Sequence, residues 1–181
     1  KDGLVELFSI EEEQLTSTSF NSKRIYALRD DYISSIDSVI AFLQDRDPTL
    51  AHFICERNFL PEASKFDQLE DLEWAFGTMG IRDQARHIST LYLEDLSDFI
   101  VEVIDPYFGF SRYAERLGMS ASSFDEIYVE LQAPNSFITD RMLGILEREI
   151  ENAQASLVCL SVPFPGNLFA ALTCGAWIKE Q

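Results

Sequence analysis

The sequence predicts a mainly α-helical protein whose last part begins an α/β unit. Through most of the first 155 residues, apolar positions recur every three or four residues, as they do along one face of a helix. From residue 157 the pattern changes to a continuous apolar run of strand length, which is typical of a strand covered on both faces. Another helical pattern follows this run. We therefore expect a multi-helix domain at 1–155, and at 156–181 one β-strand and one helix of an incomplete Rossmann-like unit.

The composition is that of a globular chain. Its 181 residues correspond to one domain and a fraction at about 150 residues per domain, and 46% apolar residues exclude a disordered chain. Fourteen basic residues against 31 acidic ones give a net charge of −17. Because such a charge repels phosphate backbones and anionic lipids, nucleic acid and membrane surfaces are not expected partners.

The cysteines and the absence of targeting signals predict a location. Cys55, Cys159 and Cys174 are odd in number and show no C-x-x-C spacing, which indicates reduced thiols and no metal site. No apolar run approaches the roughly 18 residues of a membrane span, and no signal-peptide pattern is visible. We expect a soluble, cytoplasmic protein. Since the chain starts at Lys1 without an initiator methionine, we also expect a piece of a longer polypeptide.

The first half of the chain carries several helical patterns. A long helix is predicted over 25–43, and Asp47-Pro48 predicts the start of a short helix that carries Leu50, Phe53 and Ile54. A short amphipathic helix is expected at 67–76. The strongest periodicity runs from Ala85 to Ile104, where Asp105-Pro106 should end the helix because the residue before a proline avoids helical geometry. Residues 4–8 are a weak candidate for a second strand.

The second half predicts further helices and then the strand. A short helix is expected at 111–117, closed at Gly118, and Ser123-x-x-Glu126 reads as the capping box of the next helix. A long helix carries Ile138, Met142, Ile145, Leu146 and Ile150 on one face. The strand follows at 157–162, then a turn at 163–167 and a helix at 168–179. Since a parallel strand needs neighbours, we expect it to pair either with another chain or with sequence absent from this one.

The turn after the predicted strand is the first candidate site. In open α/β sheets, ligands bind between the end of a strand and the N-terminus of the next helix. The residues in that position are Ser161, Pro163, Phe164, Pro165, Gly166 and Asn167. A single glycine does not make a dinucleotide fingerprint, and an ordinary tight turn remains the alternative.

The string LVCLSVPFPGNLFAALTCGAWIK at 157–179 resembles a stretch of the cobalamin-binding-type domain in a family of B12-binding-domain radical SAM proteins. DPTLAHFICERNFLPEASKF at 47–66 and YLEDLSDFIVEVIDPYFGFSRYAERLG at 92–118 are similar to the region before that strand. The resemblance implies a non-catalytic N-terminal segment that helps to form the cobalamin and substrate side of a larger enzyme. The full-length protein would use cobalamin, a 4Fe–4S cluster and S-adenosylmethionine. In this chain the turn at 161–167 would supply contacts beside the macrocycle.

Two motifs of such enzymes are missing from the chain. It has no C-x-x-x-C-x-x-C, so it cannot hold the cluster, and neither His52 nor His87 stands in a D-x-H-x-x-G motif that could ligate cobalt. We therefore expect no catalytic residue, no metal ligand and no tightly bound cofactor in this chain. The expected partner is the remainder of the same polypeptide, the radical SAM domain. Strand-mediated self-association of this piece is a further expectation.

Two other clusters have a structural and a functional interpretation. The aromatic loop at 107–113 could line a flat ligand, with Arg112 and Arg116 as an anion anchor, or could fill the gap between helices. The acidic face with His87, Glu94, Asp98 and Glu102 could bind metal, although a solvated helix face is the simpler interpretation. The alternative function is a stand-alone helical protein–protein interaction module. Hydrolase motifs such as G-x-S-x-G and H-E-x-x-H are absent.

Overall fold

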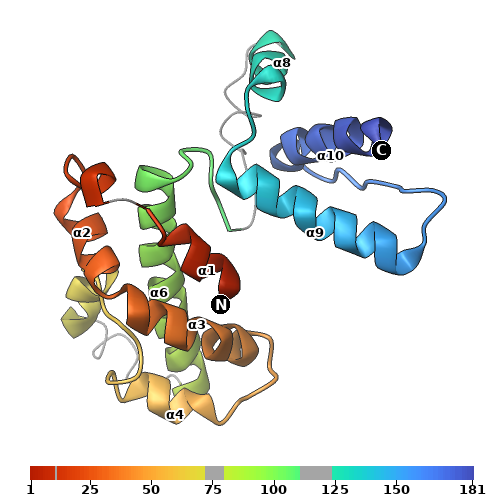
Figure 1. Cartoon of the computed structure of the whole chain (residues 1–181). Helices are drawn as coiled ribbons and strands as arrows, with labels where there is room; N and C mark the ends of the chain where they lie inside the picture. Colours follow the sequence, from red (N-terminus) through yellow and green to blue (C-terminus); the bar gives the residue numbers. More distant parts are fainter. Residues whose placement is uncertain (11, 72–79, 111–123) are drawn as a thin grey trace. The chain divides into compact units, whose positions relative to one another are not determined.

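The structure, a computed structural model, describes residues 1–10, 12–71, 80–110 and 124–181. Within these residues all regular secondary structure is helical (Figure 1). The chain divides into two compact units, Lys1–Val103 and Ile104–Gln181. The predicted domain boundary at residue 155 stays a prediction, because compactness alone does not define a domain. The predicted helix at 111–117 and the start of its neighbour at Ser123 lie outside the described residues.

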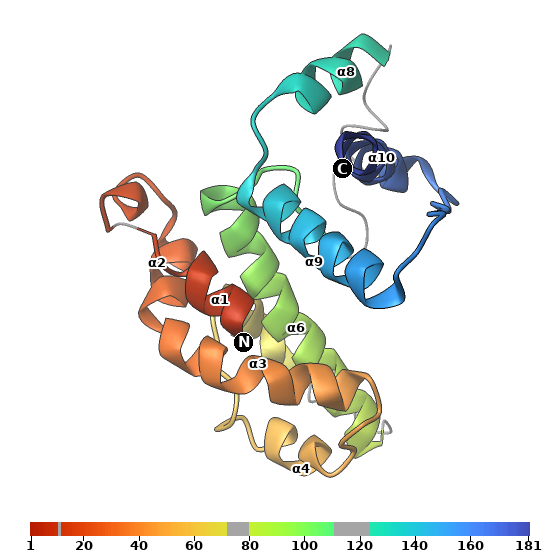
Figure 2. The ribbon, with the colours of Figure 1, turned by 45° about the vertical axis from the view of Figure 1, so that its right-hand side comes forward.

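The first unit is built around one long helix. Figures 1 and 2 show α6 crossed by α2, α3 and α4, and η2 also packs against it. The elements of this unit are α1 (Asp2–Leu7), η1 (Glu12–Leu15), α2 (Phe20–Ala27), α3 (Arg29–Leu43), α4 (Leu50–Cys55), η2 (Ser64–Asp71) and α6 (Ile81–Val103).

The apolar stripe of α6 forms the centre of this unit. The predicted core positions are buried: Ala85, Ile88, Tyr92, Leu96 and Phe99. The ring of Phe99 lies 5.1 Å from that of Phe8, and the ring of Tyr92 lies 4.9 Å from that of Tyr32, measured between centroids. The helix ends at Val103, ahead of Asp105-Pro106, as predicted. The periodicity of α6 therefore identified both a helix and the buried face of the first unit.

Other predictions for the first unit need correction. The single helix predicted at 25–43 is two helices, because Leu28 leaves helical geometry at φ −94° and ψ 10°. The first of them begins earlier than predicted, where the Ser19 hydroxyl caps α2 by accepting a hydrogen bond from the Ser22 amide at 3.2 Å. The weak strand candidate at 4–8 lies largely in helix α1.

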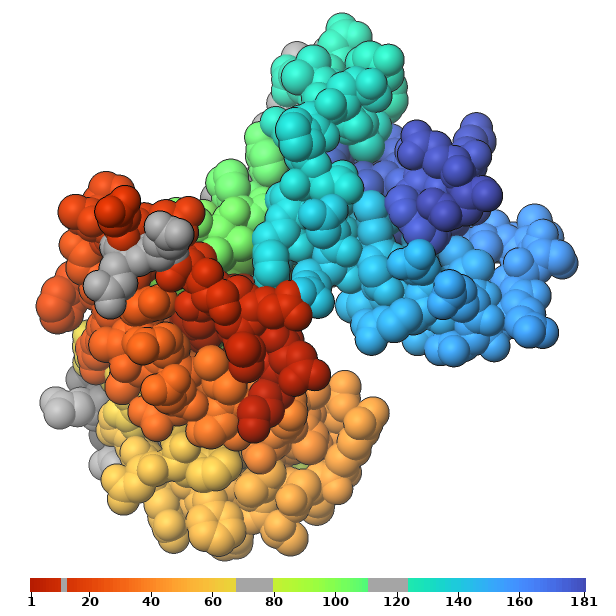
Figure 3. Space-filling view, in the orientation of Figure 1, coloured from red at the N-terminus to blue at the C-terminus, as the bar shows by residue number. Residues whose placement is uncertain are grey.

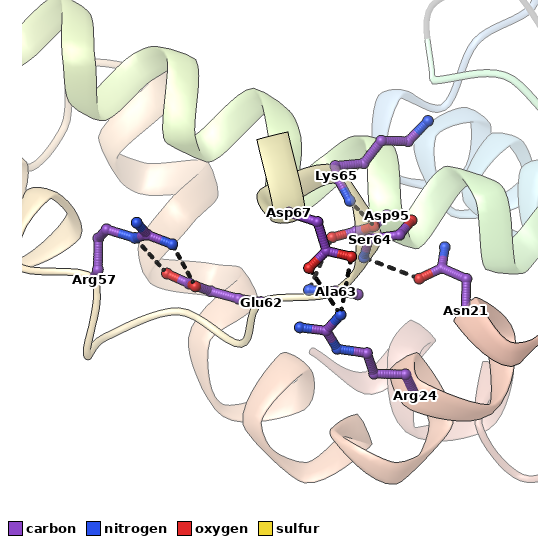
Figure 4. A network of polar contacts seen from close by, with 9 residues as sticks. All are labelled: Asn21, Arg24, Arg57, Glu62, Ala63, Ser64, Lys65, Asp67 and Asp95. Atoms are coloured by element: carbon purple, nitrogen blue, oxygen red, sulfur yellow. Dashed lines mark hydrogen bonds and ion pairs between the residues drawn. The ribbon is translucent and has the colours of Figure 1, made fainter. Parts of the chain in front are cut away.

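A buried carboxylate fastens the start of η2 to α6. Asp95 is fully buried, and its two carboxylate oxygens accept hydrogen bonds from the backbone amides of Ala63 at 3.2 Å and Lys65 at 3.1 Å (Figure 4). Asn21 accepts a bond from the intervening Ser64 amide at 3.0 Å. The first backbone donors of η2, and the one just before it, thereby hold this short helix on α6.

The second unit contains α8 (Phe124–Gln132), α9 (Phe137–Ala153), the short η3 (Pro165–Asn167) and α10 (Leu168–Glu180). The α10 helix packs against both α8 and α9. Its hydrophobic cluster is small: Ile127 and Phe169 are buried, and Tyr107, Leu131, Leu168 and Leu172 pack against them. The Ser136 hydroxyl caps α9 by accepting from the Thr139 amide at 3.2 Å. The helix predicted at 168–179 is confirmed as α10.

The predicted strand at 157–162 is wrong, and with it the predicted fold class. The described part of the chain contains no β-strand, so the incomplete Rossmann-like, cobalamin-binding-type unit is not present. Residues 157–163 form an irregular connection between α9 and η3. A strand exists only through hydrogen bonds to a neighbour, and the described residues offer this segment none.

Candidate interaction surface

Residues 154–164, which connect α9 to η3, expose apolar side chains to solvent, and we call them the exposed segment. Leu157 is 79% exposed, Phe164 is 53% exposed, and Leu160 and Val162 are each 43% exposed. Figure 3 shows atoms of α9 and of the chain that follows it on the visible face of this unit. Scattered apolar residues on a surface are ordinary, whereas large contiguous exposed apolar patches are typical of contact regions.

Charge is missing from the same region. From Asn152 through Ile178 no residue is charged or histidine, although the whole chain carries 45 such acidic and basic groups, 31 plus 14. The stretch includes the exposed segment, η3 and most of α10. The sequence alone shows this signal. Charged residues are depleted both in protein cores and at the buried centre of interfaces.

Helix α10 has the composition of a core helix. Its own apolar side chains are distributed over all faces of the helix up to Lys179. Helices of that kind are normally buried in the centre of a protein. In this structure its buried residues are Phe169 and Cys174, whereas most of its other side chains are partly accessible. Among the described residues, α10 therefore buries only part of its apolar surface.

A groove runs where α9, the exposed segment and the end of α10 meet. Its volume is about 320 Å³, close to the lower end of the roughly 300–1,000 Å³ of known ligand sites. Two carboxylates of α9, Glu147 and Glu151, stand at its wall, spaced four residues apart. The apolar part of its lining is Ile150, Leu157, Val158, Trp177 and Ile178. This groove together with the exposed segment is the candidate interaction surface.

The predicted turn residues do not form a ligand crevice. Ser161, Pro163, Phe164 and Pro165 are exposed, and Gly166 is buried at the start of η3. The backbone amide of Asn167 donates to the Phe164 carbonyl at 3.0 Å, while the Asn167 side chain caps nothing. The described residues contain no sheet edge that could enclose these side chains in a crevice. The arrangement does not fit a cobalamin macrocycle.

The aromatic loop is partly a packing element. The hydroxyl of Tyr107 donates to Glu130 at 3.0 Å, which raises the pKa of that tyrosine, and the ring packs on the cluster of the second unit. Phe108 and Phe110 meet edge to face at 5.0 Å between centroids. Arg112 and Arg116 lie outside the described residues. For Tyr107 the structural interpretation of the loop fits best.

The acidic face of α6 serves the fold. Glu102 accepts hydrogen bonds from the Ser19 amide and hydroxyl, each at 2.6 Å, and from the Ser22 hydroxyl at 2.5 Å. These donors hold the pKa of Glu102 below its usual range. Asp98 pairs with Lys65 at 2.9 Å. Among the described residues no three His, Cys, Asp or Glu side chains are grouped as a metal site would need.

The three cysteines differ in environment. Cys159 is exposed in the segment after α9, Cys174 is buried in α10, and Cys55 is half-buried with its thiol 3.4 Å from the Ile81 carbonyl. Burial raises the pKa of both Cys55 and Cys174. Neither of these two thiols is therefore set up as a nucleophile.

Comparisons with known proteins give no match: no family, no curated protein and no solved structure is significantly similar to this chain. The described residues contain no helix long and apolar enough to cross a membrane.

Proposed function

We propose that this chain is a non-catalytic N-terminal segment of a radical SAM enzyme with a cobalamin-binding-type region, and that its second unit is an assembly surface for the rest of that enzyme. The observation that carries the proposal is the uncharged stretch at 152–178, which folds into an exposed segment and a half-covered apolar helix. The resemblance of 157–179 to that family supports it. The 4Fe–4S cluster and S-adenosylmethionine would belong to the radical SAM domain of the longer protein.

In this proposal the chain supplies an assembly surface for the rest of the enzyme and does not itself bind cobalamin. The turn at 161–167 lies open to solvent, and no histidine is present between Asn152 and Ile178 to ligate cobalt. Hydroxocobalamin titrated into the 181-residue chain should leave the visible spectrum of the cofactor unchanged. Tight stoichiometric binding with a shifted spectrum would contradict this assignment.

The coding sequence beyond Gln181 tests the proposal directly. We expect a continuing reading frame that contains C-x-x-x-C-x-x-C, the ligand set of the radical SAM cluster. A continuing frame without that motif, or a stop codon at this point, would remove the radical SAM assignment.

Hydrogen exchange tests the assembly surface independently of the motif. In the 181-residue chain, the amides of 157–162 should exchange quickly because the described residues hold none of them in a hydrogen bond. In the longer protein the same amides should be protected. The amides of α6 serve as the internal control, since they are protected in both. Equal exchange of 157–162 in both proteins would contradict the assembly role.

A second candidate function is a stand-alone protein interaction module, which a groove between α8 and α10 favours. Phe124 and Tyr128 are each more than half exposed and face each other at 6.2 Å between ring centroids. They line a groove of about 460 Å³ together with small residues of α10, Ala171 and Gly175 among them. A natural stop codon near Gln181, with cooperative folding of the isolated monomer, would favour this function.

A further inference from the structure

We infer that the groove between α9, the exposed segment and the end of α10 binds a basic amphipathic helix from the rest of the longer protein. This inference deepens the proposed function, on which it rests, by naming the chemistry of what covers this part of the assembly surface. We call the apolar residues that line the groove its floor: Ile150 comes from α9, Leu157 and Val158 from the exposed segment, and Trp177 and Ile178 from α10. A volume of about 320 Å³ suits a few large apolar side chains rather than a whole domain.

The electrostatics of the groove select a positively charged occupant. Glu147 and Glu151 stand on its wall, and none of the described residues that line it is basic. Both glutamates are exposed, and the chain as a whole carries −17. A second copy of this chain would bring the same excess of negative charge, so self-association through this groove is opposed. A lysine- or arginine-rich partner gains from the local carboxylates and from the overall charge.

The spacing of the carboxylates favours a helical partner. Glu147 and Glu151 are four residues apart on α9, so they project from the same face about one turn apart. A partner helix can place two basic side chains one turn apart in the same way. Its apolar residues, three and four positions apart, can then enter the floor beside Trp177. The geometry thus predicts apolar anchors that alternate with lysine or arginine along one helix.

A model peptide makes the inference testable without knowing the natural partner. The probe is a fourteen-residue leucine–lysine peptide with helical spacing, and its matched control has glutamate at every lysine position. Trp177 serves as the reporter: the chain has two tryptophans, so Trp74→Phe leaves it alone. The leucine–lysine peptide should shift Trp177 emission to the blue with saturation, and the leucine–glutamate peptide should not. Calorimetry on the natural chain repeats the titration without the substitution.

Substitutions locate the binding. Ile150→Asp and Val158→Asp, both on the groove floor, should each weaken binding at least tenfold. Val129→Asp on α8 is the matched control, because Val129 is 65% exposed and does not line the groove. Glu147→Gln with Glu151→Gln should weaken binding by roughly three- to tenfold at low salt. The matched pair Asp140→Asn with Glu149→Gln removes the same charge from α9 outside the groove and should have a smaller effect.

Several outcomes would overturn the inference. Equal binding by the floor variants and Val129→Asp would place the peptide elsewhere, and equal loss in the two charge pairs would indicate attraction to net charge alone. Binding of the leucine–glutamate peptide would remove the electrostatic argument. A dimer in sedimentation that Val158→Asp dissolves would make the groove an interface between copies. None of these results bears on the coding-sequence test, so the two proposals fail separately.

Discussion

The two units of this protein bury their apolar residues to very different extents. In the first unit, Tyr32, Tyr92, Phe42 and Phe99 are almost completely enclosed, and charged side chains pair on the outside. In the second unit the hydrophobic cluster has two buried members, while an uncharged stretch stays accessible. Among the described residues, the first unit encloses a core of large side chains and the second leaves most of its apolar residues accessible, which is the pattern that the proposed assembly surface predicts.

Core truncation should give the largest difference between the units. Phe99→Ala removes a fully buried ring from the first unit and should lower its free energy of unfolding by about 3–5 kcal/mol. Leu157→Ala, at an exposed position of the second unit, should change stability by no more than about 0.5 kcal/mol. Urea unfolding followed by circular dichroism measures both.

Phe99→Leu is the milder variant if Phe99→Ala does not fold. Its loss of unfolding free energy should lie between those of Phe99→Ala and Leu157→Ala. A comparable loss for Leu157→Ala and Phe99→Ala would mean that residues 157–162 belong to a core already formed in this chain, and the contrast between the units would disappear.

The buried carboxylate of the first unit should show an intermediate effect. Asp95→Asn replaces one of two acceptor oxygens with a donor that faces a backbone amide, at a cost of about 1–3 kcal/mol. Burial raises the pKa of Asp95 in spite of its two hydrogen bonds. The folded state therefore binds this proton more tightly than the unfolded state, and the natural chain gains stability as pH falls through the raised pKa.

The cost of Asp95→Asn should accordingly grow as pH decreases from neutral toward the ordinary aspartate range. Asp98→Asn, one turn further along α6, breaks an exposed pair with Lys65 and should cost at most about 1 kcal/mol. Urea unfolding at several pH values distinguishes them. A cost for Asp95→Asn that shrinks on acidification would show that the hydrogen bonds outweigh burial.

The contribution of Glu102 to stability should depend on pH in the opposite sense to that of Asp95, and it should be smaller. Its carboxylate receives hydrogen bonds from Ser19 and Ser22 at the start of α2, and these lower its pKa. Stability from such a group is present above the unfolded pKa and is lost as pH falls through the folded one. Glu102→Gln should cost about 1 kcal/mol at neutral pH and progressively less in acid.

Glu94→Gln is the control, because it is an exposed glutamate on the same helix for which no bond to α2 is present. Its cost should be close to zero at every pH tested. If Glu102→Gln cost the same at pH 7 and in acid, the hydrogen bonds at the start of α2 would not depend on the ionised carboxylate.

Sequence periodicity correctly predicted the helices whose position depends on nearby residues alone. The α6 stripe was correct because its apolar spacing is uninterrupted and a proline follows its end. The contacts of Glu102 with the start of α2, and those of Asp95 with the amides of Ala63 and Lys65, were missed because they join residues distant in sequence.

The strand prediction failed for a similar physical reason. An apolar run such as 157–162 has the composition of a buried strand, but pairing is supplied by other parts of a protein, and in the described residues none is near. On α9 the predicted face was likewise apolar, yet Ile145 on it is 53% exposed. The candidate surface itself could have been found by noting that no charge occurs between 152 and 178.

The cysteines allow the openness of the second unit to be measured with little perturbation. Cys159 is exposed in the segment after α9, whereas Cys174 is buried in α10 and burial raises the pKa of its thiol. Because the thiolate is the reacting form, Cys159 should react with a disulfide reagent roughly tenfold faster or more at neutral pH. Cys159→Ser should remove the fast phase, Cys174→Ser should leave it, and Cys55→Ser controls for the third thiol. Binding of the leucine–lysine peptide should slow the fast phase, since Cys159 adjoins Val158 on the groove floor. A fast phase that keeps its full amplitude in Cys159→Ser would mean that Cys159 is covered and that the contrast between the units is smaller than the structure indicates.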